Sequence, residues 1–137
     1  MTTTDVLRGV PLFSGMTDRA IEAIADLMTE ATFDDGEAIV REGEPGETFI
    51  VLTGGSAQVE RHGQAIATLG RGDFLGEISL IDGGERTATV TARGPVTALV
   101  VQRTDFRRLM DEFGAVRYHI LSALTRRIRR DATAATL

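Results

Sequence analysis

The chain has 137 residues, of which 42% are hydrophobic, and its 15 basic and 20 acidic residues give a formal net charge of −5. This length fits one domain, and the negative charge opposes binding to nucleic acids and anionic membranes unless a local basic patch overrides it. The chain contains no cysteine, which excludes disulfides, thiolate metal sites and cysteine nucleophiles together.

The N-terminal sequence Met-Thr-Thr-Thr-Asp lacks the basic and then apolar pattern of a secretory signal peptide. No apolar run approaches the roughly 18 residues that a membrane-spanning helix needs. We therefore expect a soluble, cytoplasmic protein that makes no membrane contact.

Residues 5–30 are predicted to be a helical N-terminal segment. Thr17 is typical of an N-cap, and apolar side chains follow it at the spacing of three and four that marks one helix face. These side chains belong to Ala20, Ile21, Ile24, Ala25, Leu27 and Met28. The short apolar segment Val10–Phe13 is expected to pack on a neighbouring element.

Residues 31–102 are predicted to form a β-barrel. The β-branched runs in this range are residues 38–40, 48–53, 57–60, 65–69, 87–92 and 96–102. The glycine-containing segments Thr53–Ser56 and Arg61–Gln64 are typical of hairpin loops, so the strands they join should pair antiparallel. Closing such a sheet removes its exposed edges. The sequence therefore predicts a mainly β protein with flanking helices, built on an antiparallel β jelly-roll barrel.

Residues 104–131 are predicted to form two C-terminal helices. Thr104 is a candidate N-cap for a helix over residues 105–113, Gly114 a candidate end, and a second helix should run from about Ala115 to Asp131. The apolar stripe of the second helix contains Val116, Ile120, Leu124 and Ile128. This stripe could pack on the barrel or on a second copy of the chain, so a homodimer stays open. The tail after Asp131 is expected to fray.

The segment Gly70–Ala88 fits neither strand alternation nor a full helix, and such an insertion in a barrel is suited to hold a ligand. Gly76 allows close backbone approach, and a helical turn beginning near Glu77 would direct N–H groups at an anion. Arg86 offers a planar fork of donors for two phosphate oxygens. Glu77 would then accept hydrogen bonds from sugar hydroxyls. The alternative is a surface ion pair between Glu77 and Arg86, with the glycines serving only as turns.

Two stretches, Gly76-Glu77-Ile78-Ser79-Leu80-Ile81 and Arg86-Thr87-Ala88-Thr89-Val90, resemble the phosphate-binding cassette of the cyclic-nucleotide-binding domain. That family includes bacterial catabolite activator protein, cyclic-nucleotide-dependent kinases and gated channels. The likeness covers nearly the whole chain, at Leu12–Phe13, Gly36, Gly43–Gly46, Gly54 and Gly70–Phe74.

The resemblance implies a single domain over residues 1–137 with its cassette at residues 74–88. It implies that Glu77 binds the ribose 2′-hydroxyl, that Arg86 binds the cyclic phosphate, and that backbone N–H groups near Ser79 and Thr87 complete the phosphate shell. The predicted nucleotide-binding residues are Phe74, Leu75, Gly76, Glu77, Ile78, Ser79, Arg86, Thr87, Ala88 and Arg126.

The base preference depends on Thr87, whose hydroxyl in this family can bond the amino group of guanine or serve the phosphate instead. Cyclic AMP is the preferred ligand, and cyclic GMP stays an alternative. In the family the last helix covers the base, which makes Arg126 the first candidate lid, by stacking of its guanidinium on the purine, and Arg127 the second. The alternative is a solvated helix end whose cations favour the carbonyl dipole.

Other classes of function find little support in the sequence. His62 and His119 fall in different predicted elements, and the predicted strands contain no histidine, so we expect no metal, no cofactor and no catalysis. No helix-turn-helix follows the last helix, so nucleic-acid binding is not expected, and a DNA-associated regulator stays an alternative. The resemblance implies a regulatory module in signal transduction whose C-terminal helices move with the ligand and report to an effector protein that the sequence does not identify.

Overall fold

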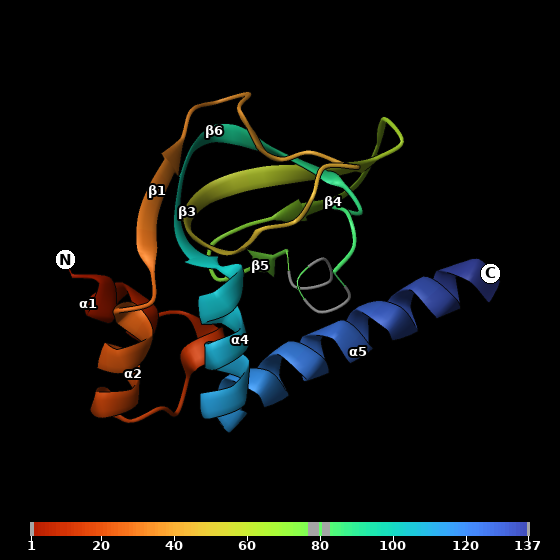
Figure 1. The fold of residues 1–137 in the computed structure, drawn as a ribbon. Helices are drawn as coiled ribbons and strands as arrows, with labels where there is room; N and C mark the ends of the chain where they lie inside the picture. The colour runs from red at the N-terminus through yellow and green to blue at the C-terminus, as the bar shows by residue number, and fades with distance from the viewer. Residues whose placement is uncertain (1, 77–79, 81–82, 137) are drawn as a thin grey trace.

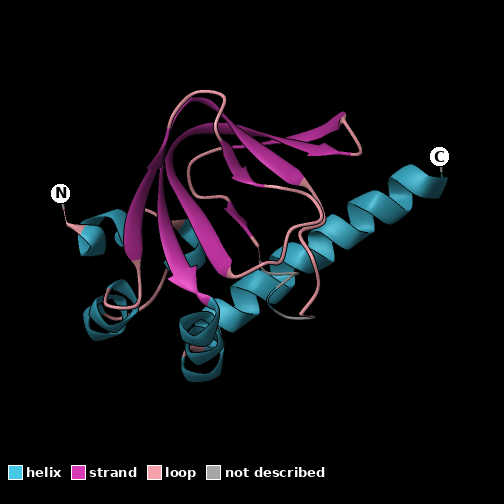
Figure 2. Cartoon of the chain, turned by 45° about the horizontal axis from the view of Figure 1, so that its top comes forward, coloured by secondary structure: helices cyan, strands magenta, loops and turns pink. Residues whose placement is uncertain are grey.

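The computed structural model describes residues 2–76, 80 and 83–136, with side chains described as far as residue 126 (Figure 1). In chain order the elements are α1 (Thr3–Arg8), η1 (Pro11–Phe13), α2 (Asp18–Ala25), β1 (Thr29–Phe33), β2 (Ala38–Val40), β3 (Thr48–Arg61), β4 (Gln64–Leu69), β5 (Phe74–Leu75), β6 (Thr89–Gln102), α4 (Arg103–Glu112) and α5 (Gly114–Thr136). The strands form a curved sheet, and the helices gather at one end of it (Figure 2). This arrangement confirms a mainly β fold with flanking helices.

The sheet is antiparallel and is built around two long strands, β3 and β6, which pair along most of their lengths. The strand order is β1-β6-β3-β4, while β2 pairs with β6 and β5 pairs with β3. Each long strand therefore has different neighbours along its two halves, as a jelly roll requires. The hydrogen-bonded path begins at β1 and ends at β4, so the described strands do not close into the barrel that the sequence predicted.

A bend in β3 replaces one of the two predicted hairpins. The sequence predicted a loop at Thr53–Ser56, but β3 runs through this segment and shifts its register against β6 on both sides of Gly54. Gly55 has a φ of +85°, and a Cβ there would overlap the Pro95 carbonyl. The glycines thus let β3 bend tightly against β6. The other hairpin is confirmed, since His62 and Gly63 both adopt positive φ between β3 and β4.

The core has two parts because alternate side chains of β3 face opposite sides. Phe49 and Val51 belong to a cluster that packs against the helices, whereas Ile50 and Leu52 belong to a cluster inside the roll. Phe49 is fully buried, and its ring lies 5.6 Å from that of Phe74 and 4.9 Å from that of Phe106 in α4. The helix-facing cluster therefore joins the sheet to the C-terminal helices.

The N-terminal helices agree with the sequence in part. Thr17 is the N-cap of α2 and accepts a hydrogen bond from the Ala20 N–H at 3.2 Å, as predicted. The segment Val10–Phe13 packs into the helix-facing cluster through Val10, Leu12 and Phe13. β1 was not among the predicted strands, because its largely exposed side chains give only a weak alternating pattern.

The C-terminal helices begin and end at other residues than predicted. α4 begins at Arg103, not after Thr104, and its N-cap residue Gln102 makes no side-chain capping bond. The Arg103 N–H instead donates to the Glu47 carbonyl at 3.1 Å, so the tertiary contact sets the start of the helix. Gly114 begins α5 instead of ending α4. The tail was expected to fray after Asp131, but the backbone is helical through Thr136, in keeping with the helix propensity of its alanines.

α5 packs through its first half and extends away from the roll (Figure 1). Val116 and Ile120 are fully buried and Leu124 is partly buried in the helix-facing cluster, while Tyr118 is 69% exposed. The predicted apolar stripe is therefore confirmed as far as Leu124, and Ile128 lies outside the described side chains. In the residues that the structure describes, we find no helix with the length and apolar character that crossing a bilayer requires.

Candidate functional site

The predicted ligand segment is reached through a tight loop that is fixed to β3. The Gly70 N–H donates to the Asp73 carboxylate at 2.8 Å. The Leu52 N–H donates to the Asp73 carbonyl at 2.9 Å, and the Gly72 N–H donates to the Leu52 carbonyl at 2.8 Å. The next residues form β5, in which Leu75 pairs with Ile50. The chain therefore arrives at Gly76 from a rigid edge of the sheet.

Gly76 and Arg86 meet at the centre of the candidate site. Gly76 has a φ of +96°, and a Cβ built on it would lie 2.5 Å from Arg86 Nη1 and 2.5 Å from the Thr48 carbonyl oxygen. Only glycine leaves room for the guanidinium at this point. The Leu80 N–H donates to the Gly76 carbonyl at 3.4 Å. The structure thus brings together the glycine and the arginine that the sequence singled out.

Arg86 is buried, with 7% of its surface exposed, although it carries a permanent charge. Its Nη2 donates to the Thr48 carbonyl at 2.9 Å and to the Thr48 hydroxyl at 3.0 Å. A buried guanidinium is costly unless it is paired or bonded. This buried position is suited to binding an anion, and it differs from the exposed position of an arginine in a surface ion pair.

The main chain around Arg86 is held by the loop between β2 and β3. The Arg86 N–H donates to the Glu44 carbonyl at 2.8 Å, and the Gly43 N–H donates to the Arg86 carbonyl at 3.0 Å. Pro45 and Glu85 form an antiparallel bridge one position further along. These contacts fix the backbone from which the guanidinium projects.

Thr87 and Ala88 follow Arg86 and lead into β6. Thr87 is exposed, and its carbonyl accepts a hydrogen bond from Arg61 Nε at 3.1 Å. Ala88 is 9% exposed and belongs to the core. Glu42 supports the same stretch, because its N–H donates to the Thr89 hydroxyl at 2.9 Å. The exposed Thr87 side chain is thus presented on a backbone that is fixed on both sides.

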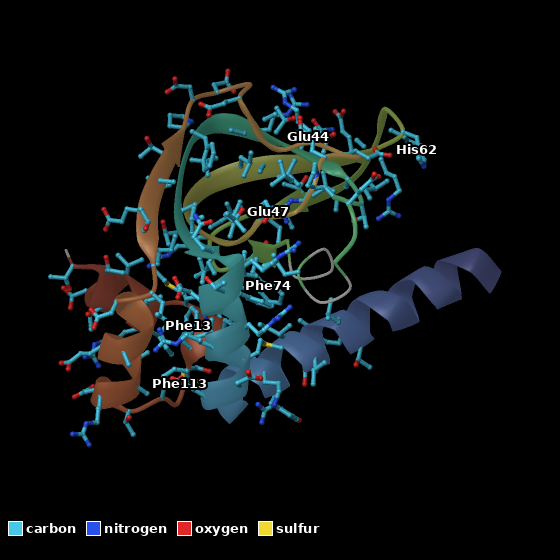
Figure 3. All side chains as sticks on the ribbon, in the orientation of Figure 1. Phe13, Glu44, Glu47, His62, Phe74 and Phe113 are labelled. Carbon is cyan, nitrogen blue, oxygen red and sulfur yellow. The ribbon has the colours of Figure 1, made fainter. Side chains whose placement is uncertain are left out.

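Three apolar residues of the predicted cassette are buried and pack into the two core clusters. Phe74 is 7% exposed and belongs to the helix-facing cluster (Figure 3). Leu75, also 7% exposed, belongs to the cluster inside the roll. Leu80 is 6% exposed and lies in the same cluster as Val116 and Ile120 of α5. The side chains of Phe74 and Leu75 are therefore part of the packing that supports the site.

The remaining predicted residues are Glu77, Ile78, Ser79 and Arg126. Glu77, Ile78 and Ser79 lie outside the described residues, so their assignment stays a prediction. Arg126 is exposed on α5, and Arg127 lies beyond the described side chains. The assignment of a base-covering residue also stays a prediction.

Two residues that support the site were missed by the sequence analysis. Thr48 holds Arg86 from 38 positions away, and Arg61 holds the Thr87 carbonyl from 26 positions away. Neither residue stands in a recognisable motif, and the pairing arises only when β3 folds beside the cassette. No local pattern in the sequence could have identified them.

Comparison with known families agrees with this geometry. The model of the family described as Cyclic nucleotide-binding domain matches residues 30–113, which include most of β1, all of β2 to β6, and α4. The matched range contains Gly76, Arg86 and Thr48. The chain belongs to the cyclic nucleotide-binding domain family.

Relatives of the chain include kinases and kinase regulators. The chain is 34% identical over 118 residues to a cGMP-dependent protein kinase, egl-4, of Caenorhabditis briggsae, covering 81% of this chain and 16% of the relative. It is 33% identical over 106 residues to a cAMP-dependent protein kinase regulatory subunit of Yarrowia lipolytica, covering 76% of this chain and 28% of the relative. The matched segment is thus less than a third of the length of either relative.

Among solved structures, the fold resembles the regulatory domain of Toxoplasma gondii PKA crystallised with cAMP. The two share 29% sequence identity with a TM-score of 0.80, and the match covers 90% of this chain and 49% of the other. This likeness confirms the jelly-roll architecture with its flanking helices.

Proposed function

We propose that this chain is a sensor module that binds a cyclic nucleotide, preferentially cyclic AMP, and signals through movement of its C-terminal helices. The observation that carries the proposal is the buried guanidinium of Arg86, held by Thr48 and packed against Gly76. A charged donor fixed in this way is preorganised for a small anion, because its orientation is already set before the anion arrives. The net charge of −5 makes such a local cation necessary for capturing an anion.

The chemistry of the remaining ligand atoms is assigned by the family pattern. Glu77 is proposed to accept hydrogen bonds from the ribose 2′-hydroxyl, and backbone N–H groups near Ser79 and Thr87 to complete the phosphate shell. Arg126 is proposed to cover the base by stacking. These proposed contacts need no further bound group, so we propose no cofactor, no metal and no catalysis.

Both cyclic nucleotides are represented among the relatives. One relative is named for cGMP and the other for cAMP, and the Toxoplasma gondii structure contains cAMP. The exposed Thr87 is compatible with either ligand, since its hydroxyl can bond a guanine amino group or the phosphate. We keep cyclic AMP as the preferred ligand because hydroxyl residues at this position often accompany cyclic AMP in bacterial relatives.

The proposed signal rests on packing that links the cassette to the helices. Leu80, whose N–H bonds the Gly76 carbonyl, is buried with Phe106 of α4 and with Val116 of α5. A ligand that draws Gly76 and Leu80 towards Arg86 would change the surface on which both helices pack. Such a ligand shifts the helices only if it binds one arrangement more tightly than the other, and the phosphate contacts supply that difference. An effector protein, which the chain itself does not identify, would detect the movement.

Calorimetric titration with cyclic AMP and with cyclic GMP tests the proposal. Arg86→Ala should weaken binding by about 2–5 kcal/mol, because it removes the main partner of a desolvated anion. Arg93→Ala is the matched control, since Arg93 is an exposed arginine on β6. Unchanged affinity in Arg86→Ala, with a normal thermal midpoint, would refute the assigned role. Tighter binding of cyclic GMP would reverse the ligand preference, and phosphodiesterase activity in the same preparation would contradict the non-enzymatic assignment.

A further inference from the structure

The tip of the β3–β4 hairpin contacts the loop that follows β2. The His62 N–H donates to Glu42 Oε1 at 2.9 Å, and His62 Nδ1 lies 3.0 Å from Glu42 Oε2. His62 has a φ of +53°, which is uncommon for a residue other than glycine and which brings its N–H and its ring to the same carboxylate. Figure 3 shows His62 at the tip of this hairpin. One side chain, that of Glu42, therefore holds the hairpin tip through two contacts.

The hairpin tip also bonds the main chain of the candidate site. Arg61, the residue before His62, donates from its Nε to the Thr87 carbonyl at 3.1 Å. Because Arg61 and His62 are adjacent in the chain, a movement of the tip also moves the donor that Thr87 accepts from. The position of the hairpin tip therefore affects the residue that follows Arg86.

The Glu42 side of the contact leads to the same stretch of main chain. The Glu42 N–H donates to the Thr89 hydroxyl at 2.9 Å, and the N–H of the next residue, Gly43, donates to the Arg86 carbonyl at 3.0 Å. The chain from Arg86 to Thr89 is thus bonded by two separate segments, and the contact between Glu42 and His62 joins those segments to each other. We call the three residues that make this connection the hairpin clamp: Glu42, Arg61 and His62.

We propose that Glu42 and His62 are positioning residues for the phosphate site and that protonation of His62 tightens nucleotide binding. This inference rests on the proposed function. Imidazole is the side chain that changes its charge between about pH 5 and pH 8, and only its protonated form makes an ion pair with a carboxylate. The ion pair holds the hairpin tip to the loop after β2 and so restricts Arg86 and Thr87 to the arrangement that accepts the anion. Restricting them before the ligand arrives lowers the entropic cost of binding.

The charges near His62 leave Glu42 as its partner. The His62 side chain is 83% exposed and the Glu42 side chain 27% exposed, so the effect of the pair is modest. Among the residues that the structure describes, Glu42 is the one carboxylate that pairs with His62. β4, the other arm of the hairpin, carries no charged residue. The other charged residues of the elements that meet there are Arg41 and Glu44 after β2, Glu60 and Arg61 on β3, Glu85 and Arg86 before β6, and Arg93 on β6.

Calorimetric titration with cyclic AMP and cyclic GMP at about pH 6 and about pH 8 compares the charged and the neutral imidazole. The cyclic phosphodiester keeps its single negative charge over this range, so the charge of the ligand does not change. His62→Asn removes the titrating group and suits the positive φ, and His62→Lys supplies a cation at both pH values. Glu42→Gln keeps an acceptor for the His62 N–H but removes the charge. His119→Gln on α5 is the control, because the chain has only two histidines.

We expect the parent and His119→Gln to bind nucleotide about two- to fivefold more tightly at the lower pH, the range that an exposed ion pair supports. His62→Asn and Glu42→Gln should bind at both pH values as the parent does at the higher pH, and His62→Lys as the parent does at the lower pH. Equal affinity of the parent at both pH values overturns the positioning role alone. So does a pH dependence that persists in folded His62→Asn, or in folded Glu42→Gln, where protonated His62 would then attract the nucleotide without Glu42. If the parent binds neither nucleotide at either pH, the proposed function fails and this inference fails with it.

Discussion

The contact between Gly76 and the Arg86 guanidinium makes a sharp prediction for Gly76→Ala. The backbone has a φ of +96°, and the new Cβ would lie 2.5 Å from both Arg86 Nη1 and the Thr48 carbonyl oxygen. A non-glycine residue at positive φ costs about 1–2 kcal/mol, and overpacking against a fixed backbone atom adds about 1–3 kcal/mol. The free energy of unfolding should therefore fall by about 2–5 kcal/mol.

The same substitution should weaken nucleotide binding, because the guanidinium must move away from the new methyl group. Loss of one hydrogen bond to a charged group corresponds to about 1.5–3 kcal/mol, which raises the dissociation constant roughly tenfold to hundredfold. Urea unfolding and calorimetry measure the two effects separately.

Gly36→Ala is the matched control for backbone strain. Gly36 has a φ of +82°, and a Cβ there would meet nothing within 4 Å. It should lose only the conformational part, about 1–2 kcal/mol, and should bind nucleotide as the parent does. Equal losses of stability and unchanged affinity in both variants would refute the packing of Arg86 on Gly76.

Two further substitutions test the support of the site. Phe49→Ala should lower the free energy of unfolding, measured in urea, by about 3–5 kcal/mol, because the fully buried ring contacts both Phe74 and Phe106. Tyr118→Ala, at an exposed position, is the control and should change this free energy by less than about 0.5 kcal/mol. Equal losses of stability in the two variants would contradict the described core. Arg61→Ala removes the donor to the Thr87 carbonyl and should weaken nucleotide binding by about 0.5–1.5 kcal/mol in calorimetry, whereas parental affinity would mean that this contact does not position the cassette.

The sequence predicted local features well wherever a few adjacent residues decide them. Thr17 caps α2 because its own hydroxyl reaches the Ala20 N–H, and His62-Gly63 turns because both residues accept positive φ. The sequence failed at Thr53–Ser56, where a similar glycine pattern bends β3 without turning it. The difference lies in Pro95 and Thr97 of β6, which pack so closely on Gly54 and Gly55 that only glycine fits.

The candidate site likewise has residues that the sequence alone identifies and a geometry that only the folded chain decides. Gly76 and Arg86 stand ten residues apart in a recognisable pattern, so the sequence alone could select them. Their geometry depends on Thr48, whose strand folds beside the cassette. The start of α4 likewise depends on carbonyl groups of Gly46 and Glu47 far upstream. Long-range acceptors of this kind leave no local mark in the sequence.

The sequence by itself determined most of the strand segments, the cap of α2, the apolar stripe of α5 and the motif that places a glycine and an arginine in one segment. These features follow from side-chain chemistry and periodicity over a few residues. Only the tertiary structure decided that Arg86 is buried on Gly76 and that the segment Glu44–Thr48 bonds both Arg86 and the start of α4. Burial and hydrogen-bond partners arise from residues that meet across the sheet, and that meeting exists only in the folded chain.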